Sequence, residues 1–387
     1  MDLPNQLAKL ARGAAQIISE AELADKLRRG RPLRVKLGVD PTSPDIHLGH
    51  TVVIRKLRDF QELGHQAVLI IGDFTALVGD PSGQSITRPQ LTPDQVRVNA
   101  ETYRDQAFKI LEEARTEIVY NSSWLGKFAY EDVIRLNSRV TLQQLLQRED
   151  FRARVKNEQP IHAHEIQYPI MQGWDSVMVK ADVELGGTDQ LFNILLGREL
   201  QRDNDQPEQV VLLTPLLEGL DGEKKMSKSL GNYVALNDSP AEIFGKIMSI
   251  SDQLMVRYYA LLLSRDLPVG EHPLEAKKQL AAEIVATYHS RRAAQDAWDQ
   301  WTLRFSKKRL DEAELPVLPA QADDLVTLVV RGFALCGLQK SRAEASRLIK
   351  QGSVQLDREK LRDPTAQVAL VANQILRLDK THAVRIA

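Results

Sequence analysis

The sequence predicts an α/β protein, built as a Rossmann-like, doubly wound parallel sheet followed by an α-helical domain and a small α+β domain. In the first 231 residues, short apolar segments alternate with segments of helical periodicity, which is typical of a parallel sheet. Residues 67–73 (AVLIIGD) form a short apolar run, as expected for a strand that is buried on both faces. After Gly231 the pattern becomes mainly helical, which marks the start of a second domain.

The strands and helices of the first domain can be placed in order. Residues 33–40 predict a strand, and residues 47–63 predict a helix whose apolar side chains share one face. The run at 67–73 is the next strand, and a polar loop at 81–89 leads into a helix from about residue 92 to 111. In such a sheet, ligands bind at the carboxyl ends of the strands. Further strands are predicted at residues 117–120, 182–185 and 209–213.

The residue pattern changes twice in the second half of the chain. Residues 239–305 have a helical pattern, and residues 306–324 form a charged, proline-containing segment that suits a linker. From about Leu325 onward we expect a helix, a basic stretch and short strands. The expected domains are residues 1–231, 232–320 and 325–387.

Composition excludes several kinds of site and indicates one kind of partner. Cys336 is the only cysteine among 387 residues, so an intrachain disulfide and a thiolate zinc cluster are excluded, and we predict no metal site. No apolar stretch reaches membrane-spanning length and the N-terminus lacks a signal-peptide core, so we expect a cytoplasmic protein without membrane contact. Residues 338–387 carry ten Lys or Arg against five Asp or Glu, while the whole chain has a net charge of −1. This basic end predicts a polyanionic partner, with a solvated charged surface as the alternative.

Two histidines stand at the turn between the first predicted strand and its helix. His47 and His50 lie three residues apart in the sequence HLGH, with Gly49 between them. The start of a helix offers backbone N–H groups and the positive end of a dipole to a phosphate. Gly49 has no side chain, so a base or ribose can approach the backbone. For an isolated match, two surface histidines at a helix start are the commoner explanation.

A lysine-bearing loop occurs later in the chain. The sequence GEKKMSKSLGN carries Lys225 and Lys228, with Gly222 and Gly231 as candidate hinges. Ammonium groups in such a loop can neutralise the charge that develops on a pyrophosphate leaving group. A solvated lysine-rich loop is the alternative. The order of the two motifs along an α/β pattern favours a nucleoside triphosphate site.

The HLGH turn and the KMSKS loop resemble the two signatures of class I aminoacyl-tRNA synthetases, and the whole chain resembles the bacterial tyrosyl-tRNA synthetases. The resemblance implies that ATP activates tyrosine to tyrosyl-adenylate, which then charges tRNA(Tyr). A carboxylate nucleophile needs no general base, so the first step depends on positioning and on donors worth roughly 2–4 kcal/mol each. Mg²⁺ would come with ATP. The implied catalytic residues are Thr42, His47, His50, Lys225 and Lys228, and the ATP contacts add Asp40, Gly49 and Asp189.

A polar stripe marks the amino-acid site. Tyr168, Gln172 and Asp175 fall at i, i+4 and i+7 of a predicted helix whose other side chains are mostly apolar. Buried polar groups must be paired, either with a ligand or within the protein. The resemblance implies that Asp175 accepts the substrate phenol, and that Asp80, Tyr168 and Gln172 surround its ammonium group. The implied tyrosine-binding residues are Lys36, Gly38, Asp80, Tyr168, Gln172, Asp175 and Gln190.

Two positions depart from the family pattern. Lys36 stands where one branch of the family has a tyrosine that helps to read the phenol, so Asp175 would use a different partner here. Gln84 stands where many relatives have a lysine, which leaves Arg88 as the cation of that loop.

The C-terminal residues 338–387 resemble a small αL-type RNA-binding domain found in many tyrosyl-tRNA synthetases. Recognition through shape and backbone is expected, because few aromatic residues accompany the basic ones. A solvated helix face is the alternative. The basic residues placed to follow a phosphate backbone are Lys340, Arg342, Arg347 and Lys350.

Three other functions compete with this interpretation. A tryptophanyl-tRNA synthetase shares the fold and both nucleotide motifs, but lacks the YPIMQGWD stripe and the RNA-binding tail. A tRNA-independent nucleotidyltransferase leaves the lysine loop and the basic tail unexplained. A non-catalytic RNA-binding protein on a synthetase scaffold could lose active-site groups, which are present here. A homodimer is implied by the resemblance alone.

Overall fold

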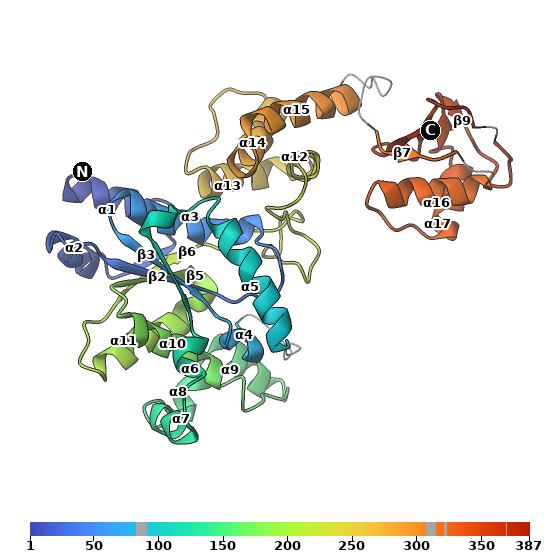
Figure 1. Cartoon of the computed structure of the whole chain (residues 1–387). Helices are drawn as coiled ribbons and strands as arrows, with labels where there is room; N and C mark the ends of the chain where they lie inside the picture. The colour runs from blue at the N-terminus through green and yellow to red at the C-terminus, as the bar shows by residue number, and fades with distance from the viewer. Residues whose placement is uncertain (83–90, 307–314, 321–322, 369) are drawn as a thin grey trace. The chain divides into compact units, whose positions relative to one another are not determined.

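The computed structural model describes residues 1–82, 91–306, 315–320, 323–368 and 370–387 (Figure 1). The chain divides into two compact units, Met1–Tyr288 and His289–Ala387. The helices expected between residues 239 and 305 fall in both units, three in the first and one in the second. The functional domain limits at residues 231, 320 and 325 remain predictions.

A six-stranded sheet forms the centre of the first unit. Its strands are β1 (Gln16–Ile18), β2 (Arg34–Val39), β3 (Gln66–Ile71), β4 (Thr116–Tyr120), β5 (Val183–Gly187) and β6 (Val210–Thr214). They lie in the order β1-β6-β5-β2-β3-β4, and all neighbours are parallel except β1 and β6. The predicted α/β class with a parallel sheet is confirmed.

Helices cover both faces of this sheet. Those of the N-terminal half are α1 (Leu3–Ala11), α2 (Glu20–Arg28), α3 (Leu48–Glu62), α4 (Thr75–Val78), α5 (Pro93–Ala107), α6 (Ser122–Leu125) and α7 (Tyr130–Asn137). The others are α8 (Leu142–Leu145), α9 (Glu149–Lys156), α10 (Gln167–Val179), α11 (Leu191–Arg202), α12 (Pro240–Met248), α13 (Asp252–Leu262) and α14 (Pro273–Tyr288). Short 3₁₀ turns occupy Glu113–Arg115 and Thr188–Gln190. None of the described helices has the length and apolar character that crossing a membrane requires.

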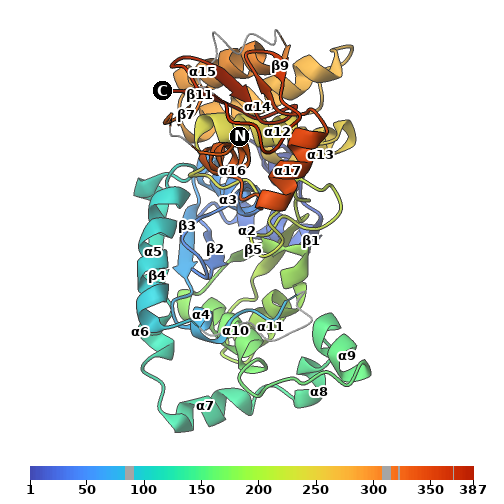
Figure 2. The same cartoon turned by 90° about the vertical axis from the view of Figure 1, so that its right-hand side faces the viewer.

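The centre of the sheet is buried from both sides, as residues 67–73 predict. Val68, Leu69 and Ile70 of β3 are at most 1% exposed. Helix α3 lies on one side of the sheet, while α10 and α11 lie on the other (Figures 1 and 2). The apolar run in the sequence therefore reflects a strand with no solvent-facing side.

Most predicted elements are found within a few residues of their expected limits, and three differences have local causes. The helix expected to reach residue 111 ends at Ala107, where the chain continues in turns. The helical segment 239–305 is divided into α12, α13, α14 and α15 (Arg291–Trp301), and Ser251 and Ser290 cap two of these helices. Strand β1 was not predicted, because three residues carry too little periodicity.

The second unit begins with α15, which is followed by a small α+β fold. A π-helical turn (Thr302–Ser306) follows α15, and α16 (Leu325–Leu335) and α17 (Arg342–Lys350) pack together. The sheet order is β7-β11-β10-β8-β9, and the core includes Val329, Phe333 and Ile349. Its strands are β7 (Val317–Leu318), β8 (Gln355–Leu356), β9 (Glu359–Lys360), β10 (Ile375–Arg377) and β11 (Ala383–Ile386).

Candidate active site

An open space lies over the middle of the sheet at Gly38. This residue belongs to the interior strand β2, yet it is exposed, and a Cβ built there would meet no atom within 4 Å. Side chains two apart on a strand point to the same face, so Lys36, Gly38 and Asp40 share this side. The Asp40 carboxylate is therefore on the same side as this space, and Lys36 lies on that side in the interior.

Asp40 is held at the carboxyl end of β2 by two hydroxyl groups. Thr75 Oγ1 donates to Asp40 Oδ1 (2.7 Å), and the Tyr168 hydroxyl donates to Asp40 Oδ2 (2.8 Å). A Cβ at Gly72 would collide with this carboxylate and with Thr75 Oγ1. The Thr42 N–H donates to the Asp40 carbonyl (2.8 Å), which shapes the turn toward the histidines. The sequence-predicted residues Asp40 and Tyr168 therefore meet directly.

The two histidines stack at the start of α3 and are uncharged. Their ring centroids are 3.8 Å apart, and the backbone N–H of His47 donates to His50 Nδ1 (3.3 Å). Burial lowers the pKa of His47 to about 2 and that of His50 to about 4, and the Lys228 charge adds to both shifts. Because His50 Nδ1 accepts a hydrogen bond, its proton lies on Nε2. A Cβ at Gly49 would approach the His47 ring to 3.0 Å.

The lysine loop is tied to the histidine turn by backbone pairing. The Leu48 N–H donates to the Val234 carbonyl (3.0 Å), and the Leu236 N–H donates to the Ile46 carbonyl (2.9 Å). These bonds belong to an antiparallel bridge between His47 and Ala235. The two nucleotide motifs, far apart in sequence, are therefore joined in the structure.

Lys225 and Lys228 of the loop make contacts that a phosphate could replace. Lys228 Nζ donates to Ser43 Oγ (2.7 Å) and to the Asp45 carbonyl. Lys225 Nζ lies 3.0 Å from Asp189 Oδ2. Burial lowers the pKa of Lys228, because its ammonium is half-enclosed. The structure brings the predicted cations to the edge of the sheet where Asp40 and the histidines lie.

Asp175 is an interior carboxylate on α10. It is 4% exposed, and it accepts hydrogen bonds from Trp124 Nε1 (2.8 Å) and Asn121 Nδ2 (3.2 Å). Burial raises the pKa of Asp175 to about 6, and the positive charge of Lys36 opposes this shift. At neutral pH the carboxylate is mainly ionised, so it offers a charged acceptor to a ligand hydroxyl.

Lys36 is fully buried and forms three polar contacts within the protein. Its ammonium group donates to the Gln172 carbonyl (2.9 Å) and Ser176 Oγ (2.7 Å), and it lies 2.8 Å from Glu184 Oε1. An ammonium has three N–H groups, so all three are used. A direct contact between Lys36 and a substrate would require one of these bonds to break.

A chain of amides joins the remaining predicted residues. Asn193 Nδ2 donates to Gln172 Oε1 (2.8 Å) and Gln190 Oε1 (3.1 Å), and Gln190 Nε2 donates to Asp80 Oδ2 (2.8 Å). Asn193 in turn accepts from Arg148 Nη1 (2.9 Å). Gln84 and Arg88 lie outside the described residues.

The sequence did not point to several polar side chains of the site. They come from loops and from several helices that no local spacing connects to the polar stripe. The exception is Asn193, which follows Gln190 by three residues and shares its side of α11. The missed residues are Thr75, Asn121, Trp124, Arg148 and Asn193.

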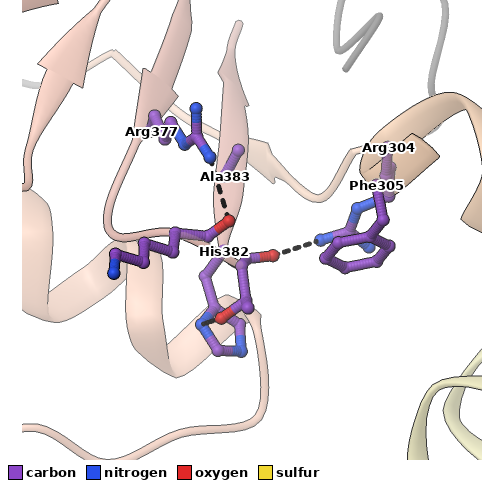
Figure 3. Close-up of a pocket in the computed structure, with 7 residues that line it drawn as sticks. Arg304, Phe305, Arg377, His382 and Ala383 are labelled. Carbon is purple, nitrogen blue, oxygen red and sulfur yellow. Dashed lines mark hydrogen bonds between the residues drawn. The ribbon is translucent and has the colours of Figure 1, made fainter. Parts of the chain in front are cut away.

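The basic residues of the second unit differ in their pairing. Lys340 Nζ lies 3.0 Å from Glu344 Oε1, and Arg342 Nη2 lies 3.1 Å from Asp324 Oδ1. Arg347 and Lys350 are exposed and form no ion pair with a described residue. A second group of basic side chains lies around a small hollow (Figure 3). The hollow is lined by Arg304, Phe305, Arg377, Lys380, Thr381, His382 and Ala383.

Comparisons with known proteins agree with this geometry. Residues 28–306 match the family described as class I tRNA synthetases (W and Y). The chain belongs to this family. It is therefore an aminoacyl-tRNA ligase, as the sequence predicts.

Individual relatives of this class I synthetase cover most or all of its length. Tyrosine–tRNA ligase 2 of Vibrio parahaemolyticus is 50% identical over 367 residues, covering 92% of each chain. The tyrosine–tRNA ligase of Oleidesulfovibrio alaskensis is 49% identical over 397 residues, covering 100% of this chain and 99% of its own. The tyrosyl-tRNA synthetase of Archaeoglobus fulgidus, solved with L-tyrosine, has a TM-score of 0.62 at 24% identity. It covers 77% of this chain and 100% of its own, and it shows the shared fold. The predicted resemblance to tyrosyl-tRNA synthetases is confirmed.

The Lys36–Glu184 pair gives a test of the interior of this synthetase. We expect Lys36→Met to lower the free energy of unfolding by about 3–5 kcal/mol, because Glu184 is left as an uncompensated buried charge. Urea denaturation measures this change. The double variant Lys36→Met/Glu184→Leu should recover most of the loss, since it removes both charges. A loss below about 1 kcal/mol in the single variant would show that the pair is not buried as described.

Proposed function

We propose that this chain, a tyrosine–tRNA ligase by its relatives, activates tyrosine at the space over Gly38 and transfers it to tRNA(Tyr). A carboxylate oxygen of tyrosine attacks the α-phosphorus of ATP, and the bond to the bridging oxygen of pyrophosphate breaks. The products are tyrosyl-adenylate and pyrophosphate. In the second step, a terminal ribose hydroxyl of the tRNA attacks the adenylate carbonyl and AMP leaves.

The nucleotide would lie between the histidine turn and the lysine loop. Neutral imidazoles donate hydrogen bonds without taking part in proton transfer, which suits a step whose nucleophile is already ionised. Thr42, His47 and His50 would contact the phosphates from the helix start, and Gly49 leaves room for the ribose or base. Lys225 and Lys228 would exchange their present partners for pyrophosphate oxygens. Asp40 and Asp189 complete the proposed ATP contacts.

ATP would enter as its Mg²⁺ complex. Mg²⁺ is generally held by nucleotide phosphates and water with few protein ligands. The groups proposed to face the phosphates are lysines, which neutralise charge, and neutral donors, which supply hydrogen bonds.

The observation that carries the choice of tyrosine is the interior carboxylate of Asp175. A phenol donates one further hydrogen bond to this carboxylate, whereas phenylalanine would displace water from it without supplying a donor. An indole N–H could also donate, so tryptophan is the substrate to exclude. Tyrosyl-tRNA synthetases are themselves the standard example of such discrimination without editing. Lys36, Gly38, Asp80, Tyr168, Gln172 and Gln190 form the rest of the proposed site.

Pyrophosphate exchange into ATP tests this function. Exchange should occur with tyrosine and stay at background with tryptophan and phenylalanine. Exchange with tryptophan would reassign the substrate, and exchange with none of the three would favour a non-catalytic RNA-binding protein.

Lys228 is expected to act mainly in the transition state. We expect Lys228→Ala to slow adenylate formation by about 10²–10³, because one charged donor to pyrophosphate is lost, with a much smaller effect on tyrosine binding. Single-turnover adenylate formation and tyrosine titration measure the two effects. Lys224→Ala is the matched control, because Lys224 is exposed in the same loop. Equal losses in rate and in tyrosine affinity would contradict the proposal.

We propose that the second unit binds the tRNA backbone through its basic side chains. Arg347 and Lys350 are the strongest candidates, because they are exposed and form no ion pair with a described residue. Lys340 and Arg342 are each paired with a carboxylate, which reduces their attraction for phosphate. The cations around the hollow at Arg304 are a further group that suits phosphate oxygens.

Charge removal at these positions should separate tRNA binding from tyrosine activation. We expect Arg347→Gln/Lys350→Gln to weaken tRNA binding and to reduce its salt slope by about 1–2, since each lost phosphate contact releases one counterion fewer. Lys340→Gln/Arg342→Gln should lose less affinity. Filter binding over a range of salt concentrations measures both variants. A fall in pyrophosphate exchange in either one would mean that these residues support the fold.

We propose that the chain acts as a homodimer in the cytoplasm, where ATP and tRNA are available. Apolar side chains on α7 and α8 support an interface between two copies. Tyr130 is 79% exposed, and Ile134 and Leu142 are each 54% exposed. Sedimentation at micromolar concentration should give a dimer, and a monomer would rule out this assembly.

A further inference from the structure

A buried arginine lies next to the site, although the sequence gave no indication of it. Arg148 precedes α9 and is 4% exposed. Its Nη1 donates to Asn193 Oδ1 (2.9 Å), and its Nη2 donates to Ser82 Oγ (2.9 Å) and Asp150 Oδ2 (3.2 Å). Its Nε donates to Asp150 Oδ1 (3.1 Å). The guanidinium charge is therefore compensated by Asp150 and by Asp80, whose Oδ1 lies 3.9 Å from Nη2, and one arm is directed at Asn193.

This contact fixes the direction of the Asn193 amide. A guanidinium only donates, so the Asn193 atom that faces it must be the carbonyl oxygen. The NH₂ group must then point the other way, toward Gln172 Oε1 (2.8 Å) and Gln190 Oε1 (3.1 Å). Asn193 is 1% exposed, so water does not compete for these bonds.

The orientation of the Asn193 amide also bears on the side-chain amides of Gln190 and Gln172. Gln190 accepts from Asn193 at its oxygen, so its NH₂ group faces Asp80 Oδ2 (2.8 Å) and keeps a second N–H. Gln172 also accepts from Asn193 and keeps a second lone pair on Oε1. Without the Asn193 donors, Gln172 could rotate and reverse its donor and acceptor, whereas Gln190 would lose one of the two contacts that hold it and would keep its bond to Asp80.

We propose that Arg148 and Asn193 are positioning residues that set the polarity of the zwitterion site. They hold Gln172 with its oxygen available to the tyrosine ammonium group, and Gln190 with its spare N–H available to the tyrosine carboxylate. This arrangement orients the carboxylate for attack on ATP. The inference rests on the proposed function, because it takes tyrosine as the ligand.

Asn193→Asp isolates this role. Aspartate keeps an acceptor for Arg148, so the buried arginine stays paired, but it cannot donate to Gln172 or Gln190. We expect the KM for tyrosine in pyrophosphate exchange to rise about tenfold or more, with the KM for ATP nearly unchanged. Asn157→Asp is the control for an added charge, because Asn157 is exposed at the end of α9.

A ligand comparison separates positioning from a general effect on the site. 3-(4-Hydroxyphenyl)propanoate lacks the ammonium group but keeps the phenol and the carboxylate. In direct titrations, Asn193→Asp should lose more affinity for tyrosine than for this analogue. Equal losses for the two ligands, or an unchanged KM for tyrosine, would overturn the inference. Wild-type protein that fails to bind tyrosine would instead overturn the proposed function.

Discussion

The site depends on a carboxylate and an ammonium group buried beneath one helix. Asp175 and Lys36 are both removed from water, and neither charge is stable in the interior without partners. Lys36 is satisfied by Glu184, Ser176 and the Gln172 carbonyl, which fastens α10 to the centre of the sheet. Asp175 is left with two neutral donors and one nearby cation, so it remains an acceptor able to bind a further hydrogen-bond donor.

The proposed nucleotide-binding half of the site has a different distribution of charge. Its fixed part, the histidine turn, is neutral, and its charged part is the lysine loop. Neutral donors can be held permanently in place because they do not repel one another. The ammonium groups of the loop instead bind protein partners such as Ser43 and Asp189, which a ligand could replace. The bridge between His47 and Ala235 keeps the two parts together. Under the proposed function, the lysine loop supplies positive charge where pyrophosphate would form, and no acid or base is required.

The fold was predictable where the sequence carries periodicity. The strand at 67–73 and the helix at 47–63 are marked by apolar spacing, which burial on a parallel sheet imposes. Strand β1 has three residues, too few to show a pattern. Residues 338–387 alone form no complete fold, because the core that contains Ile349 also contains Val329 and Phe333.

The site was predictable along single elements and less so between them. The stripe of Tyr168, Gln172 and Asp175 follows from helical spacing. The partners Asn121 and Trp124 of Asp175, and Arg148 behind Asn193, come from segments whose approach is set by tertiary packing. The three bonds of Lys36 within the protein, which support α10, also could not be predicted from local spacing, and its contact with the substrate stays a prediction.

The pH dependence of tyrosine binding tests the role of Asp175 most directly. Its pKa is raised to about 6 by burial, so the carboxylate is ionised above this value and protonated below it. A phenol binds the ionised form, and free tyrosine does not change its own charge between about pH 5 and 7. The affinity for tyrosine should therefore fall as the pH decreases through about 6, approaching a tenfold loss per pH unit. Calorimetric titration from pH 7.5 to 5 measures it. An affinity that is constant over this range would contradict the account.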